Sequence, residues 1–131
     1  MIGIDTNVLV RFLTQDDPQQ SELARRFFTQ ELSAKAPGFI GLIVLAETVW
    51  VLQRADKVSA AEILELVADL LQSPDIVIEE RDVVSRALAT ARRESCGLTD
   101  ALVAASAAAS GCQKIVSFDR AAVGAGMTLL S

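Results

Sequence analysis

The chain has 131 residues, of which 51% are hydrophobic, and a formal net charge of −5 from 17 acidic and 12 basic residues. This length fits one domain with one core, and the longest apolar stretch near the middle of the chain, 39–46, is far too short to cross a bilayer. The acidic balance argues against a simple nucleic-acid binding module, although local basic pairs such as Arg54 with Lys57 could still contact phosphates.

The first part of the chain predicts strand, helix, strand and helix. We expect a strand over 1–5, followed by a helix that begins at Pro18 behind the cap residue Asp17 and runs to about Leu32. A short strand is expected at 38–42. The next helix, over 44–54, is apolar on nearly every side, which predicts that it packs on both flanks.

The same alternation continues after residue 58. Ser59-Ala60-Ala61-Glu62 is a capping box, and apolar residues follow it at helical spacing, at Ile63, Leu66, Val67, Leu70 and Leu71. A strand is expected at 75–78, and then a helix with a buried stripe of Val84, Ala87, Leu88 and Ala91. Thr99 is expected to cap a helix over 100–110 that Gly111 closes in a left-handed conformation. A strand over 114–118, a helical turn and a strand over 127–130 complete an α/β pattern.

Four acidic residues occupy places where open α/β sheets bind ligands. Asp5 ends the first strand, Asp119 ends the strand over 114–118, Asp100 opens a helix, and Glu47 interrupts the apolar helix. Carboxylates gathered at one edge of a sheet repel one another strongly unless a cation lies between them. The pattern therefore predicts a divalent metal site.

Each acid also has a structural interpretation. Asp5 and Asp119 can cap the segments that follow their strands, and the helix dipole stabilises Asp100 whatever its function. Glu47 resists this explanation, because its helical neighbours Ile43, Val44, Trp50 and Val51 are apolar and no basic residue lies within one turn. A carboxylate buried there without a partner costs several kcal/mol, which favours a metal as its partner.

Residue types that the chain lacks narrow the chemistry further. Without histidine, triads built on a histidine base and histidine-ligated zinc are excluded, and no glycine-rich loop is present to hold a nucleotide phosphate. Cys96 and Cys112 are not spaced as metal ligands and are expected to be reduced, packed thiols. Because the N-terminus shows no basic leader, we also expect a cytoplasmic protein. Oxygen ligands remain, and they suit Mg²⁺ or Mn²⁺ and a phosphate substrate.

The chain carries four motifs in order: the segment 4–10, the apolar helix that bears Glu47, and the segments 99–105 and 116–119. With these motifs in this order, the chain resembles the PIN-domain ribonucleases, and specifically the VapC-type toxins of prokaryotic toxin–antitoxin pairs. The resemblance covers essentially the whole chain as a single PIN domain, 1–131, and implies an α/β fold with a central parallel sheet flanked by α-helices on both sides. It implies an acidic site of Asp5, Glu47, Asp100 and Asp119. Thr6, Asn7 and Ser117 correspond to the polar residues that support such a site.

The resemblance also implies a function. The chain would be an Mg²⁺- or Mn²⁺-dependent endoribonuclease that cuts a structured RNA such as tRNA, paired with a VapB-like antitoxin and forming a homodimer. Asp5 and Asp100 would bind the metal directly, and Asp119 and Glu47 would complete the site. Many relatives carry a further acid three residues before Asp100, where this chain has Gly97, so the number of metals stays open.

Two other classes of function are open. A catalytically silent PIN-fold binding or scaffold protein is favoured by Gly97 but disfavoured by the presence of all four acids. A phosphatase of the haloacid-dehalogenase type needs a second Asp where the chain has Asn7, and a phosphoaspartyl receiver needs a lysine at the end of a late strand, whereas Lys114 begins one. Both forms of the second class, the phosphatase and the receiver, therefore fit poorly.

Overall fold

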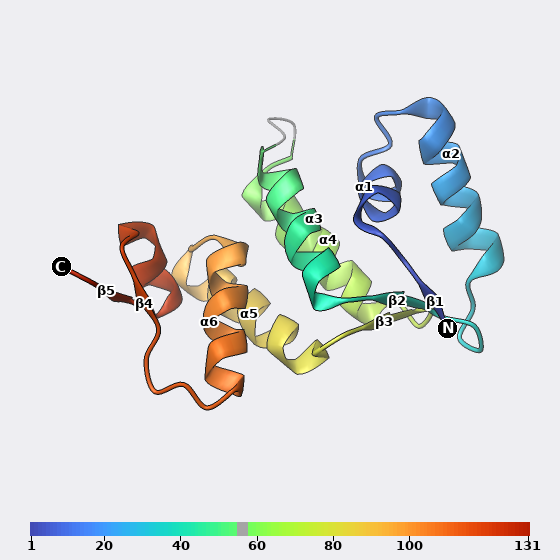
Figure 1. Cartoon of the computed structure of the whole chain (residues 1–131). Coiled ribbons are helices and arrows are strands. Elements are labelled where there is room, and N and C mark those ends of the chain that lie inside the picture. The colour runs from blue at the N-terminus through green and yellow to red at the C-terminus, as the bar shows by residue number, and fades with distance from the viewer. Residues whose placement is uncertain (55–57) are drawn as a thin grey trace. The chain divides into compact units, whose positions relative to one another are not determined.

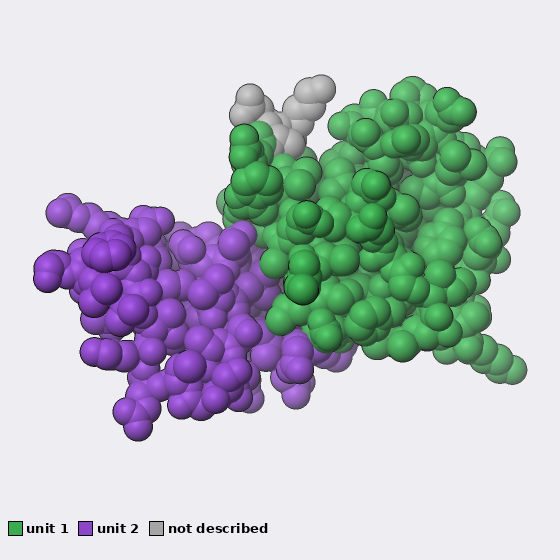
Figure 2. Space-filling model, viewed as in Figure 1, with its two compact units in different colours: residues 1–79 green, residues 80–131 purple. Residues whose placement is uncertain are grey.

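The computed structural model describes residues 1–54 and 58–131. Lys57 therefore lies outside the described residues, and with it the local basic patch predicted for Arg54 and Lys57. The chain divides into two compact units, Met1–Glu79 and Glu80–Ser131 (Figure 2). Strands and helices alternate along the chain and the strands pair in parallel, so the predicted α/β class is confirmed (Figure 1). Among the described residues, no helix is long and apolar enough to span a membrane.

A three-stranded parallel sheet organises the first unit. Its strands are β1 (Ile2–Gly3), β2 (Gly38–Ile40) and β3 (Ile76–Ile78), with β2 in the middle. The sheet is tightly packed where β2 begins, because a Cβ added at Gly38 would lie 2.6 Å from Cδ1 of Ile4. Parallel neighbours need long crossover connections, and helices between the strands provide them.

The helices of the first unit are α1 (Thr6–Thr14), α2 (Pro18–Arg26), α3 (Leu42–Arg54) and α4 (Ala60–Gln72), and a π-helical turn, η1 (Phe27–Glu31), extends α2. The two helix caps predicted in this unit, Asp17 and Ser59, are confirmed. Oδ1 of Asp17 accepts from the N–H of Gln20 at 3.0 Å, and Oγ of Ser59 accepts from the N–H of Glu62 at 3.1 Å. Local sequence signals were therefore sufficient to locate where α2 and α4 begin.

Helix α3 begins two residues before the expected residue 44. The N–H of Leu42 donates to Oε1 of Glu79 at 2.8 Å, so a carboxylate just beyond β3 satisfies one of the free amide groups at the start of the helix. Glu79 lies 37 residues from Leu42 in the chain. Sequence spacing does not reveal a cap that comes from so far away.

Helix α1 was not predicted. Val8 and Val10 are β-branched residues that favour strands, so the run after Asp5 gives a weak helix signal. Tertiary packing overrides this preference, because α1 packs against α2 and α3 and Leu9 is fully buried. The stacked rings of Phe12 and Phe28, with centroids 4.0 Å apart, add to the same layer. The core of the first unit comprises Ile4, Leu9, Ile40, Leu45, Val49, Leu52, Ile63, Val67, Leu70, Leu71, Ile76 and Ile78.

The second unit contains α5 (Arg81–Glu94), α6 (Leu98–Ala109) and a parallel pair of strands, β4 (Val116–Ser117) and β5 (Thr128–Leu129), joined through a 3₁₀ helix, η2 (Arg120–Ala125). Helix α5 packs along α6 and against η2. The predicted stripe of α5 is confirmed, since all four of its residues are buried, as are Val83, Leu98, Ala101, Leu102 and Ala122.

One end of α6 agrees with the prediction and the other does not. Gly111 has φ +91°, and the N–H of Cys112 donates to the carbonyl of Ala107 at 3.1 Å, which confirms the left-handed closure. The expected cap at Thr99 is wrong, because the helix begins at Leu98 with Gly97 as its cap residue. Leu98 is only 3% exposed, and its burial draws the start of the helix toward the N-terminus.

Candidate functional site

Asp5 lies immediately before α1 and caps it. Its backbone is extended, with φ −84° and ψ 160°, and Oδ1 accepts from the N–H of Thr6 at 2.8 Å. The side chain is exposed, as is that of Asn7 in the first turn of α1. The structural interpretation of Asp5 as a cap is therefore observed, and the same geometry holds a carboxylate in solvent at the positive end of a helix.

Thr6 connects two of the predicted acids. Its side chain is 8% exposed, and its hydroxyl donates a hydrogen bond to Oε1 of Glu47, which lies on α3. The backbone N–H of the same residue binds Asp5. Asp5 and Glu47, which are far apart in the sequence, thus both accept a hydrogen bond from one threonine, and each has a second carboxylate oxygen to offer.

The burial argument for Glu47 is wrong, because the side chain is exposed. Ile43 and Trp50 on the same face of α3 are also exposed, at 83% and 50%. The helix buries its opposite face, with Leu45, Thr48, Val49 and Leu52, and contacts both α1 and α4, whereas the face that bears Glu47 stays exposed. Ile43 and Trp50 are exposed along with Glu47, and its carboxylate therefore avoids the predicted desolvation.

The second unit places the other two acids at the starts of two helical segments. Asp100 lies half-buried in the first turn of α6. Asp119 is exposed and caps η2, with Oδ1 accepting from the N–H of Ala121 at 2.9 Å. Its own N–H donates to Oγ of Ser117 at 3.0 Å, so Ser117 fixes the backbone from which Asp119 projects.

The two cysteines differ in their surroundings. Cys96 is half-buried, and burial raises the pKa of its thiol, with the charge of Asp100 adding to the effect. That thiol is therefore neutral near pH 7, as expected for a packed cysteine. Cys112 is exposed, so the prediction of a packed thiol is wrong there, because this residue follows the end of α6 in a loop.

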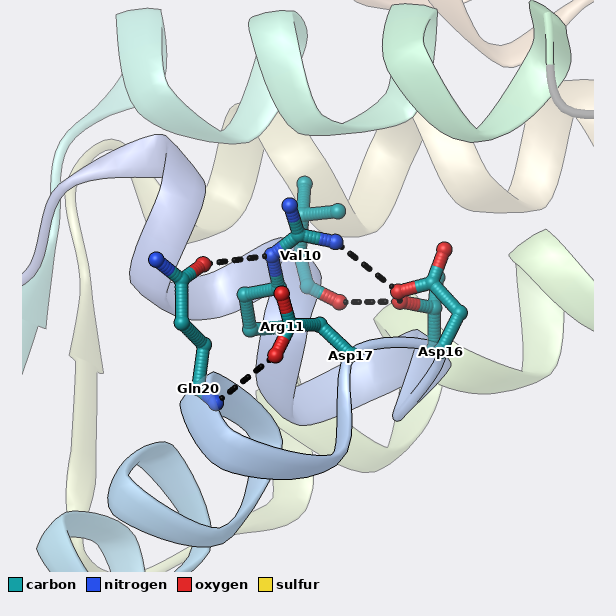
Figure 3. A network of polar contacts seen from close by, with 6 residues as sticks. Val10, Arg11, Asp16, Asp17 and Gln20 are labelled. Atoms are coloured by element: carbon teal, nitrogen blue, oxygen red, sulfur yellow. Dashed lines mark hydrogen bonds and ion pairs between the residues drawn. The ribbon is translucent and has the colours of Figure 1, made fainter.

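A pocket of about 470 Å³ opens beside Asp5. Its walls are mostly apolar and comprise Ile2, Ile4, Val8, Leu23, Ala24 and Phe27, with Asp5, Asn7, Arg11 and Gln20 as polar lining residues. Nε of Arg11 donates to Oε1 of Gln20 at 2.8 Å, and Nη1 donates to Oδ1 of Asp16 at 3.0 Å (Figure 3). A hydrogen bond from Thr14, and a weaker effect of the one from Arg11, lower the pKa of Asp16. The Asp16 carboxylate therefore stays negative beside the positive Arg11 guanidinium. Arg11 is thereby held in place at the pocket, an arrangement that the sequence analysis missed.

The donor chemistry fits a hard divalent cation. Asp5, Glu47, Asp100 and Asp119 offer carboxylate oxygens, the ligands that Mg²⁺ and Mn²⁺ prefer. Asp5 and Glu47 belong to one unit, and Asp100 and Asp119 to the other. Over residues 1–54 and 58–131, no three acidic or cysteine side chains form a group that could hold a metal ion.

Comparison with known proteins adds one finding. The model of the family described as "PIN domain" matches residues 2–123, which is nearly the whole chain and includes residues of both units. The search of curated proteins found no match.

Proposed function

The chain belongs to the PIN-domain family, and on that premise we propose that it is a metal-dependent endoribonuclease. The enzyme would hydrolyse a structured RNA such as tRNA in the cytoplasm, and it would be the toxin of a VapC-type toxin–antitoxin pair. PIN domains are generally nucleases. One observation carries the proposal for this chain: Thr6 donates a hydrogen bond to each of the exposed carboxylates of Asp5 and Glu47. Exposed carboxylates that share one neighbour are suited to bind a cation rather than to stabilise a core.

We propose that Asp5, Glu47, Asp100 and Asp119 form the catalytic metal site, with Mg²⁺ or Mn²⁺ as cofactor. Asp5 and Asp100 would bind the ion directly, and Glu47 and Asp119 would complete its shell. Thr6 and Ser117 support the acids through the hydrogen bonds described above, and Asn7 would contribute an amide at the rim of the pocket. The family match, over residues 2–123, includes most of each unit, which supports a single PIN domain over 1–131.

The chemistry would be hydrolysis of a phosphodiester bond. When bound, the divalent ion lowers the pKa of water and offsets charge that develops on the phosphate. The chain has no histidine to act as a base, so the acids themselves would accept the proton.

Removal of the metal tests the proposed function. We expect purified protein to cut tRNA in millimolar Mg²⁺ or Mn²⁺ and to stop when EDTA is added, because the acids alone repel the phosphate. Gel analysis of the fragments measures this, and restored metal should restore cleavage. RNA that binds and stays intact with either metal would instead favour a silent PIN-fold binding protein.

We propose two protein partners, a second copy of the chain and a VapB-like antitoxin. Apolar side chains that remain exposed, among them Val103, Val116 and Phe118, are of the kind that a homodimer covers. The pocket beside Asp5 supports the antitoxin, because its apolar walls fit an apolar peptide segment and Asp5 can receive a basic side chain.

Antitoxin binding and metal binding should therefore compete. We expect Mn²⁺ to weaken the affinity of an antitoxin peptide that carries an arginine, because the cation and the guanidinium occupy the same carboxylates. Calorimetric titration of the peptide with and without Mn²⁺ measures the difference, and a peptide with glutamine in place of that arginine is the control. Equal affinity in both conditions would exclude inhibition through the metal site.

A further inference from the structure

One face of α3 remains exposed in the first unit. Ile43, Glu47, Trp50 and Arg54 recur at spacings of four, three and four residues, so they lie along one side of the helix. Ile43 is 83% exposed and Trp50 is 50% exposed, while the opposite side of α3 is buried. We call these four residues the Trp50 face.

The centre of this face is an aromatic ring paired with a cation. The guanidinium carbon of Arg54 lies 4.5 Å from the centroid of the Trp50 ring, within the range of a cation–π contact. This contact orders both side chains on the helix surface. The chain has one tryptophan and no tyrosine, so a half-exposed indole is an unusual feature of its surface.

We propose that the Trp50 face is a binding platform for an unpaired, single-stranded segment of the RNA substrate, on which one base stacks against Trp50 while Arg54 contacts a neighbouring phosphate. This inference rests on the proposed function and adds to it the place where substrate is held. Aromatic rings that stack with bases beside cations that follow the backbone are the common means of binding single strands. A guanidinium already ordered over a ring can donate two parallel hydrogen bonds to a phosphate.

The position of Trp50 relative to the proposed site supports the platform. Trp50 lies one turn beyond Glu47, about 4.5 Å along the helix axis, and Arg54 lies about 10 Å along it. Glu47 is joined through Thr6 to Asp5. A base stacked on Trp50 would therefore hold the adjoining strand close to the acids.

The charges on the face favour RNA over a protein partner. The cores of protein–protein interfaces are depleted in glutamate, and Glu47 lies one turn from Trp50 on this face. A chain with net charge −5 must also meet a phosphate backbone through local cations, and Arg54 is one beside an exposed ring. Contact between two copies of the chain through this face is the alternative that the test decides.

Intrinsic fluorescence tests the platform directly, because all indole emission comes from Trp50. A short single-stranded RNA is titrated into the wild-type protein in EDTA, so that no cleavage is needed. We expect saturable quenching by the single strand and weaker quenching when the same RNA is annealed to its complement. The proposal would be overturned if Trp50 emission did not change when RNA is added, or if it changed with protein concentration in the absence of RNA.

Variants measure the contribution of each side chain. Trp50→Ala should weaken the binding of labelled RNA in EDTA, followed by anisotropy, about tenfold, and raise KM by a similar factor with kcat retained. Trp50→Phe keeps a stacking ring and should recover most of the affinity. Arg54→Gln should weaken binding, whereas Arg26→Gln, which removes another exposed helical arginine from the same unit, should not.

The outcomes separate this inference from the proposed function. If the wild-type protein cuts RNA while Trp50→Ala and Arg54→Gln bind it as tightly as wild type, the platform is wrong and the nuclease stands. If metal-dependent cleavage is absent, the nuclease is wrong, and quenching and anisotropy in EDTA still decide whether the Trp50 face binds RNA. Circular dichroism confirms that each variant is folded.

Discussion

Replacing Asp5 or Asp100 with asparagine is expected to lower the rate of RNA cleavage by at least about a hundredfold, because each change removes a charge that the reaction needs. The fold should survive both changes. Asparagine caps helices as well as aspartate does, so a side chain at position 5 can still accept from the N–H of Thr6. At position 100 the interaction of the charge with the dipole of α6 is lost, about 0.3–1 kcal/mol.

Cleavage assays and thermal melts measure these two effects separately. Asp82→Asn is the matched control for Asp100→Asn, because Asp82 lies in the first turn of α5 as Asp100 does in α6. Asp69→Asn removes an exposed acid from the first unit and serves as the control for Asp5→Asn. Wild-type cleavage by either site variant would show that the acid is misassigned.

Mg²⁺ or Mn²⁺ is expected to raise the melting temperature, since an ion that binds only the native acids stabilises the folded state by mass action. At a free concentration one hundred times the dissociation constant, the stabilisation is about 2.7 kcal/mol, which corresponds to a rise of several degrees in a chain of this size. Asp119→Asn should reduce the rise, because one of the four proposed ligand groups loses its charge.

The measurement is a set of melts at constant ionic strength with increasing divalent metal. Asp82→Asn should keep the wild-type rise, which separates binding at the proposed site from general screening by salt. Sodium chloride at matched ionic strength should leave the melting temperature nearly unchanged. A melt that does not move across millimolar Mn²⁺ would count against a metal site at these acids.

The proposed site illustrates how far sequence reasoning extends. The ordered motifs indicated the PIN-domain family, and the family match over residues 2–123 confirms that family. The same reasoning explained Glu47 by a buried charge, and the structure shows an exposed one. An apolar helix pattern shows which side chains gain from burial, but the packing of neighbouring elements decides which faces of the helix are buried. The assignment of the four acids to one metal site stays a prediction.

The sequence by itself determined what depends on neighbours in the chain: the caps at Asp17 and Ser59, the closure of α6 at Gly111, and the supply of carboxylates without histidine. These signals act over a few residues, and the backbone satisfies its hydrogen bonds there locally. Only the tertiary structure decided that residues 6–14 form a helix and that Thr6 joins Asp5 to Glu47. Both results need contacts between segments about forty residues apart, and burial of Leu9 and the Thr6 hydroxyl outweighs the strand preference of β-branched residues.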